Sequence, residues 1–126
     1  MSGWSQADLA TIGEADEIEV APDRADHTAA SWVPIWVVRV GDELYVRSFR
    51  GPSGSWYRRA RDTGHGRIRV AGTERTVVFI TAEPSTRTEV DDAYRAKYGR
   101  YGSSYITPMI SDSVAGTTLR LTAPTE

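Results

Sequence analysis

Hydrophobic and polar residues alternate over several short stretches of the chain, and a two-residue period predicts β-strands rather than long helices. Glycine-containing turns at residues 41–43 and 71–73 separate successive strands, so each turn is predicted to join a hairpin. The expected strands cover residues 17–21, 35–40, 44–49, 66–70, 74–82 and 117–122.

Only short helices are predicted between these strands. They are expected to begin at the N-capping hydroxyl residues Ser5, Ser55 and Thr86, and the second helix covers residues 56–62. Residues 22–34 contain two prolines and many small polar residues, which is typical of a long loop. Several strands, two hairpins and short helices favour a closed or nearly closed antiparallel barrel over a doubly wound sheet.

Composition narrows the class of protein further. The chain has 126 residues, enough for a single domain over residues 1–126, and 25% of them are charged. It contains no cysteine, which excludes thiol catalysis, disulfides and zinc-cysteine sites, and we predict no metal site. Because no apolar run approaches the ~20 residues of a membrane span and the N-terminus lacks a signal-peptide pattern, we expect a soluble, cytoplasmic protein.

Charge is unevenly distributed along the chain. Residues 1–26 hold seven acids and one base, whereas residues 47–69 hold seven arginines and one acid. The simplest interpretation is that these two segments face each other in the fold. Arginines beside aromatic residues also occur in nucleic-acid-binding barrels, but the net charge of -2 argues against a nucleic-acid partner.

The central block of the chain, from residue 45 to residue 79, carries a recognisable pattern. A strand is followed by a glycine-proline loop, an aromatic pair that opens a short helix, and two strands around a glycine; its residues are Gly51, Pro52, Gly54, Trp56, Tyr57, Gly66 and Gly72. This block resembles the split-barrel flavin and deazaflavin reductases, which share the pyridoxamine phosphate oxidase fold. It is most similar to short bacterial proteins known only as a domain of unknown function. The resemblance implies an α+β fold, a split antiparallel β-barrel of about six strands with short flanking helices.

The resemblance also implies a function. It predicts a small-molecule oxidoreductase that binds FMN or a deazaflavin in a pocket at the interface of a homodimer. By position, Arg47, Ser48 and Arg58 would hold the cofactor phosphate, while Trp56 and Tyr57 would pack on the ring or support the strand. Forked guanidinium donors suit phosphate. The loop at 22–34 differs from the glycine- and lysine-rich loop of the deazaflavin reductases, because it has one arginine and no lysine.

Alternative interpretations remain open from the residues alone. Arg47 could instead pair with an acid of the N-terminal segment. His27, in the long loop beside Asp26, is the candidate catalytic acid or base, since the chain has only one other histidine, His65. The barrel could also lack a cofactor and bind a small ligand, or catalyse a redox-neutral reaction of the isomerase or cyclase type, because fold alone does not decide function.

Overall fold

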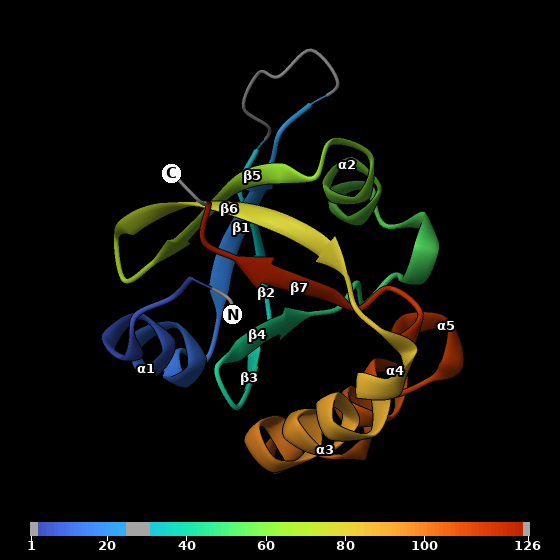
Figure 1. Ribbon diagram of the computed structural model, residues 1–126. Coiled ribbons are helices and arrows are strands. Elements are labelled where there is room, and N and C mark those ends of the chain that lie inside the picture. The colour runs from blue at the N-terminus through green and yellow to red at the C-terminus, as the bar shows by residue number, and fades with distance from the viewer. Residues whose placement is uncertain (1–2, 25–30, 125–126) are drawn as a thin grey trace.

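The computed structural model describes residues 3–24 and 31–124, and its centre is one antiparallel sheet (Figure 1). In spatial order the strands run β2-β1-β5-β6-β7-β4-β3. Both predicted hairpins are confirmed, since β3 pairs with β4 and β5 pairs with β6. The strands are β1 (Ile18–Pro22), β2 (Val33–Ile35), β3 (Val38–Val40), β4 (Glu43–Val46), β5 (His65–Val70), β6 (Thr73–Thr81) and β7 (Leu119–Thr122).

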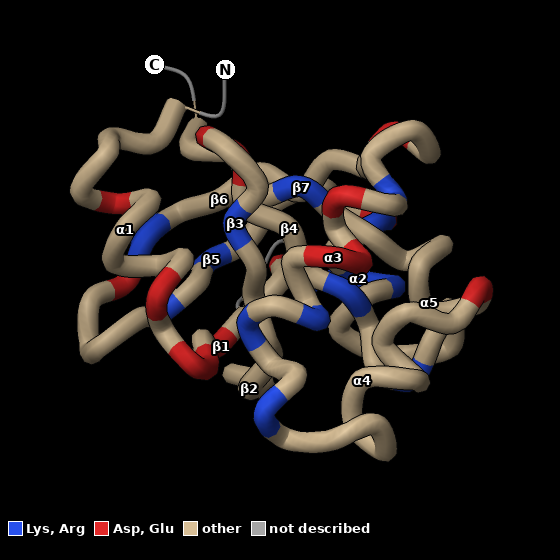
Figure 2. Tube along the Cα trace, turned by 90° about the horizontal axis from the view of Figure 1, so that it is seen from below, with Lys and Arg blue, Asp and Glu red and all other residues tan. Residues whose placement is uncertain are grey.

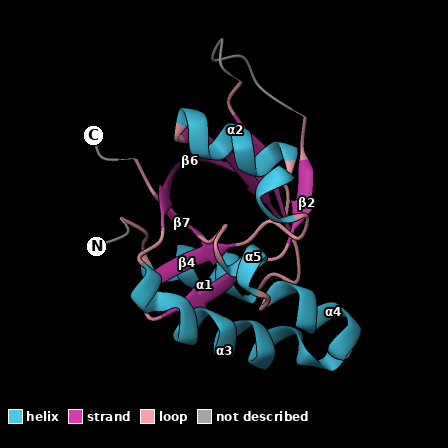
Figure 3. Cartoon of the chain, turned by 90° about the vertical axis from the view of Figure 1, so that its right-hand side faces the viewer, coloured by secondary structure: helices cyan, strands magenta, loops and turns pink. Residues whose placement is uncertain are grey.

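The sheet curls back on itself. Strands β2 and β3 occupy its two ends, yet only Trp36 and Val37 separate them in the chain, so the two edges must lie close together. Figure 3 shows the strands following a circle. The predicted α+β split barrel is therefore confirmed, with seven strands where about six were expected.

The additional strand arises because the predicted run at 35–40 is broken at Val37. The backbone N–H of Val37 donates to the Tyr98 hydroxyl (3.2 Å), and its carbonyl accepts from the Lys97 amine (2.7 Å). Both peptide groups are thus satisfied by side chains of a helix rather than by a neighbouring strand. The chain changes partner at this point, from β1 to β4.

Five α-helices flank the barrel among the described residues: α1 (Gln6–Glu14), α2 (Ser55–Thr63), α3 (Arg87–Tyr98), α4 (Ser103–Met109) and α5 (Asp112–Ala115). The predicted cap at Ser5 is confirmed, because its side chain accepts from the Asp8 N–H. The other two predicted caps are wrong. Gly54 takes the capping position of α2, and the Thr86 hydroxyl donates to the Glu83 carbonyl instead of capping α3.

Successive side chains of β4 point to opposite faces of the sheet, and each face contributes to a separate hydrophobic core. Leu44 and Val46 point into the barrel, where they join the larger core with α1 and α2. Tyr45 points outward and packs with Tyr94 and Tyr98 of α3 in a second core, which α4 and α5 complete. Arg47 lies two residues after Tyr45 and extends toward the same outer layer. Figure 1 shows α3, α4 and α5 together at this side of the sheet.

The expectation that acidic and basic segments face each other is confirmed in part. Glu19 on β1 pairs with Arg69 on β5 (2.9 Å), and Figure 2 shows acidic positions near β1 and basic positions near β5. Asp8 on α1 instead pairs with Arg75 on β6 (2.8 Å), which lies outside the basic segment 47–69. The hydrogen bonds from Arg69 lower the pKa of the Glu19 carboxyl. Over residues 3–24 and 31–124, no helix is long and apolar enough to cross a membrane.

A candidate ligand cleft between β4 and α2

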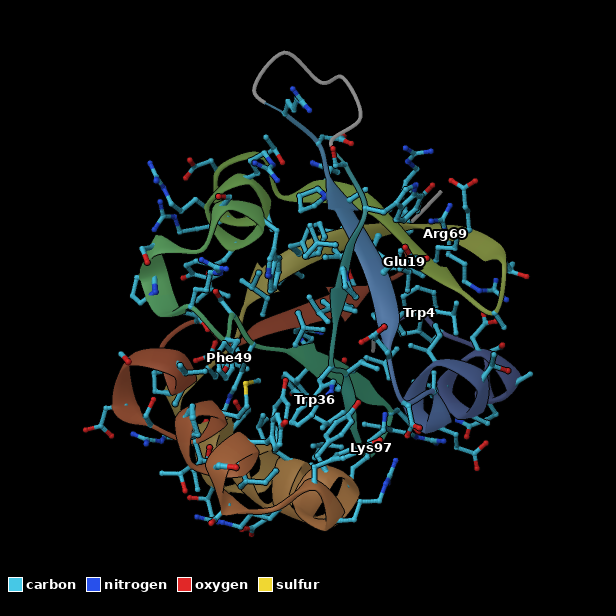
Figure 4. All side chains as sticks on the ribbon, turned by 180° about the vertical axis from the view of Figure 1, so that it is seen from behind. Trp4, Glu19, Trp36, Phe49, Arg69 and Lys97 are labelled. Carbon is cyan, nitrogen blue, oxygen red and sulfur yellow. The ribbon has the colours of Figure 1, made fainter. Side chains whose placement is uncertain are left out.

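A cleft of about 410 Å³ opens where the chain leaves β4 and enters α2. This volume lies within the range of small-molecule sites. Its described lining residues come from β2, from the segment that directly follows β4 and from the first turns of α2; they are Val33, Pro34, Ile35, Arg47, Ser48, Phe49, Arg50, Ser53, Gly54, Ser55, Trp56 and Arg59. Figure 4 labels Phe49, whose ring is 61% exposed at the rim.

The N-terminus of α2 is exposed to this cleft because no side chain caps it. Gly54 precedes the helix, and the first helical hydrogen bond runs from the Arg58 N–H to the Gly54 carbonyl (3.1 Å). The N–H groups of Ser55, Trp56 and Tyr57 therefore precede the helical ladder and favour an anion. A Cβ at Gly54 would stand 2.3 Å from the Ser48 Oγ, so a larger residue at this position would force the Ser48 side chain or the turn to move.

Arg47 forms the inner wall of the cleft. Its Nε donates to the Thr118 hydroxyl (2.8 Å), and its Nη1 donates to the Asp91 carboxylate (2.5 Å) and to the Met109 carbonyl (2.9 Å). The alternative partner predicted for Arg47, an N-terminal acid, is wrong, because its acid is Asp91 on α3. The buried Nη2 has no hydrogen-bond partner among the described residues. A buried guanidinium nitrogen without a hydrogen-bond acceptor destabilises the fold, unless a bound ligand or water supplies the acceptor.

Arg59 supplies a second such nitrogen. It is half-buried on α2, and its buried Nε has no partner among the described residues. Trp56 lies one helical turn earlier on the same face, which directs both side chains to the cleft. Arg50 adds a third guanidinium at the rim, and none of the described lining residues is acidic. The cleft is therefore suited to a ligand with a negative charge.

The opposite wall of the cleft is apolar. Val33, Pro34 and Ile35 of β2 face the Trp56 side, and Phe49 stands at the opening. An apolar wall beside arginines and a helix N-terminus matches a ligand with a flat ring and a phosphate. The donor set present therefore fits a flavin-type cofactor, with unsatisfied donors at Arg47 and Arg59 for the anionic part.

Behind Arg47, a charged network ties α3 to the cleft. Asp91 also faces Arg87 (3.5 Å), which pairs with Asp112 of α5 (2.8 Å). The Arg47 guanidinium lies 5.3 Å from the centre of the Tyr94 ring. Burial raises the pKa of Tyr94, an effect that the nearby Arg47 charge opposes only partly, so this phenol stays protonated even where an ordinary tyrosine would ionise.

Three of the five residues predicted to bind a cofactor line this cleft: Arg47, Ser48 and Trp56. Tyr57 instead packs in the barrel core, edge-on to Trp56, and Arg58 is exposed and outside the lining. His27, the predicted catalytic residue, lies outside the described residues. Arg59 was missed, although its spacing of three from Trp56 is the signal that places both on one helix face.

Solved structures of other proteins share this fold, and three of them show the extent of the likeness. A conserved hypothetical protein from Mycobacterium tuberculosis has a TM-score of 0.62 and 15% identity, over 98% of this chain and 81% of that one. An F420 reductase has a TM-score of 0.60 and 12% identity, over 94% of this chain and 93% of that one. An FAD-binding protein from Mesorhizobium loti has a TM-score of 0.56 and 12% identity, over 97% and 91%. At such identities the likeness establishes the fold alone.

Sequence comparison identifies the family. Residues 8–121 match the family described as "Uncharacterized protein conserved in bacteria (DUF2255)". Since this match spans most of the 126 residues, the chain belongs to that family, and the predicted resemblance to a bacterial domain of unknown function is confirmed. No curated protein matches the chain in sequence.

Proposed function

We propose that this member of the DUF2255 family is an oxidoreductase that binds a phosphate-bearing flavin or deazaflavin in the cleft between β4 and α2. The observation that carries the proposal is the pair of buried guanidinium nitrogens, Arg47 Nη2 and Arg59 Nε, which lack partners among the described residues and belong to an acid-free cleft. The F420 reductase and the FAD-binding protein with this fold support the choice of ligand class.

Each part of the cleft has a distinct role in this proposal. Arg59, Arg50 and the first N–H groups of α2 hold the phosphate, and the free edge of Arg47 completes its coordination. Trp56 and the β2 wall exclude water from the ring. When bound, a flavin or deazaflavin supplies hydride transfer, while the protein supplies position and electrostatics.

The phosphate assignment is tested with a matched pair of variants and a matched pair of ligands. Arg59→Ala should weaken FMN binding by about 1.5–3 kcal/mol, the range for a hydrogen bond to a charged group. Arg58→Ala is the control, because Arg58 is adjacent and exposed but does not line the cleft. Riboflavin, which lacks the phosphate, should bind weakly to every variant.

Isothermal titration would separate the outcomes. A loss confined to Arg59→Ala, and seen with FMN but not with riboflavin, is the expected result. Equal affinities of the two variants for FMN would overturn the phosphate site. If neither flavin nor deazaflavin binds while another small metabolite does, the chain is a cofactor-free ligand-binding barrel or a redox-neutral enzyme.

We also propose that the protein acts as a homodimer with the cleft at its interface. Phe49 and Tyr105 are 61% and 56% exposed, and both line a hollow of about 190 Å³ beside the main cleft. Large exposed aromatic rings of this kind are common at protein interfaces. Light scattering should give twice the chain mass for the wild type. Phe49→Ser combined with Tyr105→Ser should give a monomer, and an unchanged mass would contradict this interface.

A further inference from the structure

A second cleft lies on the far side of Trp36, between the end of α1, strand β3 and helix α3. Its volume is about 400 Å³, and Lys97 of α3 is part of its lining. Figure 4 shows Lys97 beneath Trp36 and away from Phe49, which lines the first cleft. Lys97 is the only lysine among the 126 residues, in a chain that otherwise uses arginine for its basic side chains. Lys97 lies outside the first cleft, so its role is independent of the cofactor site proposed there.

Two backbone carbonyls hold the amine in place. The Lys97 Nζ donates to the Gly13 carbonyl (2.8 Å) and to the Val37 carbonyl (2.7 Å). Among the described residues the amine has no third hydrogen-bond acceptor. A neutral amine has two N–H bonds, so it can keep both of these interactions and still have its lone pair free. The two carbonyls thus hold the neutral nitrogen in place before it reacts, and its lone pair stays available for nucleophilic attack.

Charged and titratable groups from every neighbouring element face this amine. They are Glu14 and Asp16 at the end of α1, Arg39 on β3, Tyr98 on α3 and Arg100 just after α3. Burial lowers the pKa of Lys97 to about 8; Asp16 opposes this shift and Arg100 adds to it. At pH 7 about one such amine in ten is neutral, compared with roughly one in 2,500 for an ordinary lysine of pKa about 10.4.

We propose that Lys97 is a nucleophilic amine that forms an imine with a small carbonyl compound bearing a carboxylate. The neutral nitrogen attacks the carbonyl carbon and forms a C–N bond. The carbonyl oxygen then leaves as water with the two protons of the amine, which gives the C=N bond without any change of oxidation state. The nitrogen thereby gives up its hydrogen bonds to the Gly13 and Val37 carbonyls, and the Val37 carbonyl keeps the Tyr98 hydroxyl as a donor (3.1 Å). The co-reactant is an aldehyde or keto acid, and hydrolysis reverses the step.

The preference for a carboxylate rests on the two guanidinium groups of the cleft and not on its net charge. Three cations line it, Arg39, Lys97 and Arg100, against two acids. When Lys97 is neutral, the two guanidinium charges balance the two acids, so a carboxylate would be held by guanidinium N–H groups that the acids leave free. Arg100 already pairs with Asp16 and reaches the Tyr101 hydroxyl, so it is held in position at the cleft. An Arg beside a fixed carboxylate can still accept a second anion on its remaining N–H groups.

The experiment traps the imine with cyanoborohydride and locates the adduct by peptide mass spectrometry. Glyoxylate is the anionic probe and acetaldehyde the neutral one. The control for local sequence is an acetylated peptide of residues 93–101, which carries the same lysine without the fold. The N-terminal α-amine of the protein serves as an internal comparison, and peptide mapping separates its adduct from that of Lys97.

Native Lys97 should be labelled by either probe on the order of 100-fold faster than the peptide at pH 7, with a rate midpoint near pH 8. Asp16→Asn should raise the acetaldehyde rate, because Asp16 favours the charged amine. Arg100→Gln should lower the preference for glyoxylate over acetaldehyde. Equal rates for protein and peptide, or adducts at the N-terminus only, would overturn the proposal. An unchanged probe preference in Arg100→Gln would overturn its anionic specificity. These outcomes do not depend on flavin binding in the first cleft.

Discussion

The buried ion pair between Arg47 and Asp91 makes the sharpest stability prediction. The Arg47 side chain is 0% exposed and the Asp91 side chain 12% exposed, with 2.5 Å between Nη1 and Oδ1. Asp91→Ala removes the only anion bonded to Arg47 among the described residues and leaves a guanidinium buried with Nη2 already unpaired. Removing one partner of a buried pair costs about 3–5 kcal/mol.

The adjacent residue provides the matched control for this prediction. Asp92 pairs with Arg95 on the same helix, but these side chains are 65% and 53% exposed. Asp92→Ala should therefore cost about 0–1 kcal/mol. Urea unfolding followed by tryptophan fluorescence measures both variants, and the slope of free energy against urea should stay unchanged. If Asp91→Ala loses no more stability than Asp92→Ala, the buried charge is not held by this pair and the reasoning fails.

Two further predictions concern backbone strain and pH. Ala71 has a φ of +51° in a two-residue turn with Gly72, so Ala71→Asn should raise the free energy of unfolding in urea by about 0.5–1 kcal/mol. A lower free energy of unfolding in this variant would show that Ala71 is not strained. Because the pKa of Lys97 is about 8 when folded and about 10.4 when unfolded, the unfolded chain binds more protons between these values and stability rises with pH from 8 to 10. Above pH 10 the raised pKa values of Tyr94 and Tyr98 reverse the trend, since only the unfolded tyrosines lose protons. Lys97→Met should abolish this rise in stability, which is measured as the urea midpoint at each pH. If the variant and the wild type show the same dependence of the urea midpoint on pH, Lys97 does not cause the rise.

The fold was predictable where local pattern decides it. Alternation and turn residues suffice for both hairpins, because each depends on neighbouring segments of the chain. The break at Val37 was not predictable, since its peptide groups bond to Lys97 and Tyr98, some 60 residues later. A continuous β-branched run gives no local sign that helix side chains will replace a strand partner.

The candidate site also combines features that the local sequence predicts with contacts between residues far apart in the chain. Arg47 and Trp56, which were both predicted to contact the cofactor, line the same cleft. Choosing Arg58 rather than Arg59 ignored the helical spacing, which was available from the sequence. The pairing of Arg47 with Asp91 could not be read from the sequence, because the two residues are 44 positions apart and several other acids were equally plausible partners.

If the cleft between β4 and α2 binds a phosphate-bearing flavin or deazaflavin, the purified wild-type protein should bind FMN or the deazaflavin F420. A fluorescence titration with each of the two cofactors measures this binding. We expect saturable binding at low micromolar concentration for one of them, with one ligand per chain. Absence of binding to both cofactors would contradict the proposed cofactor site.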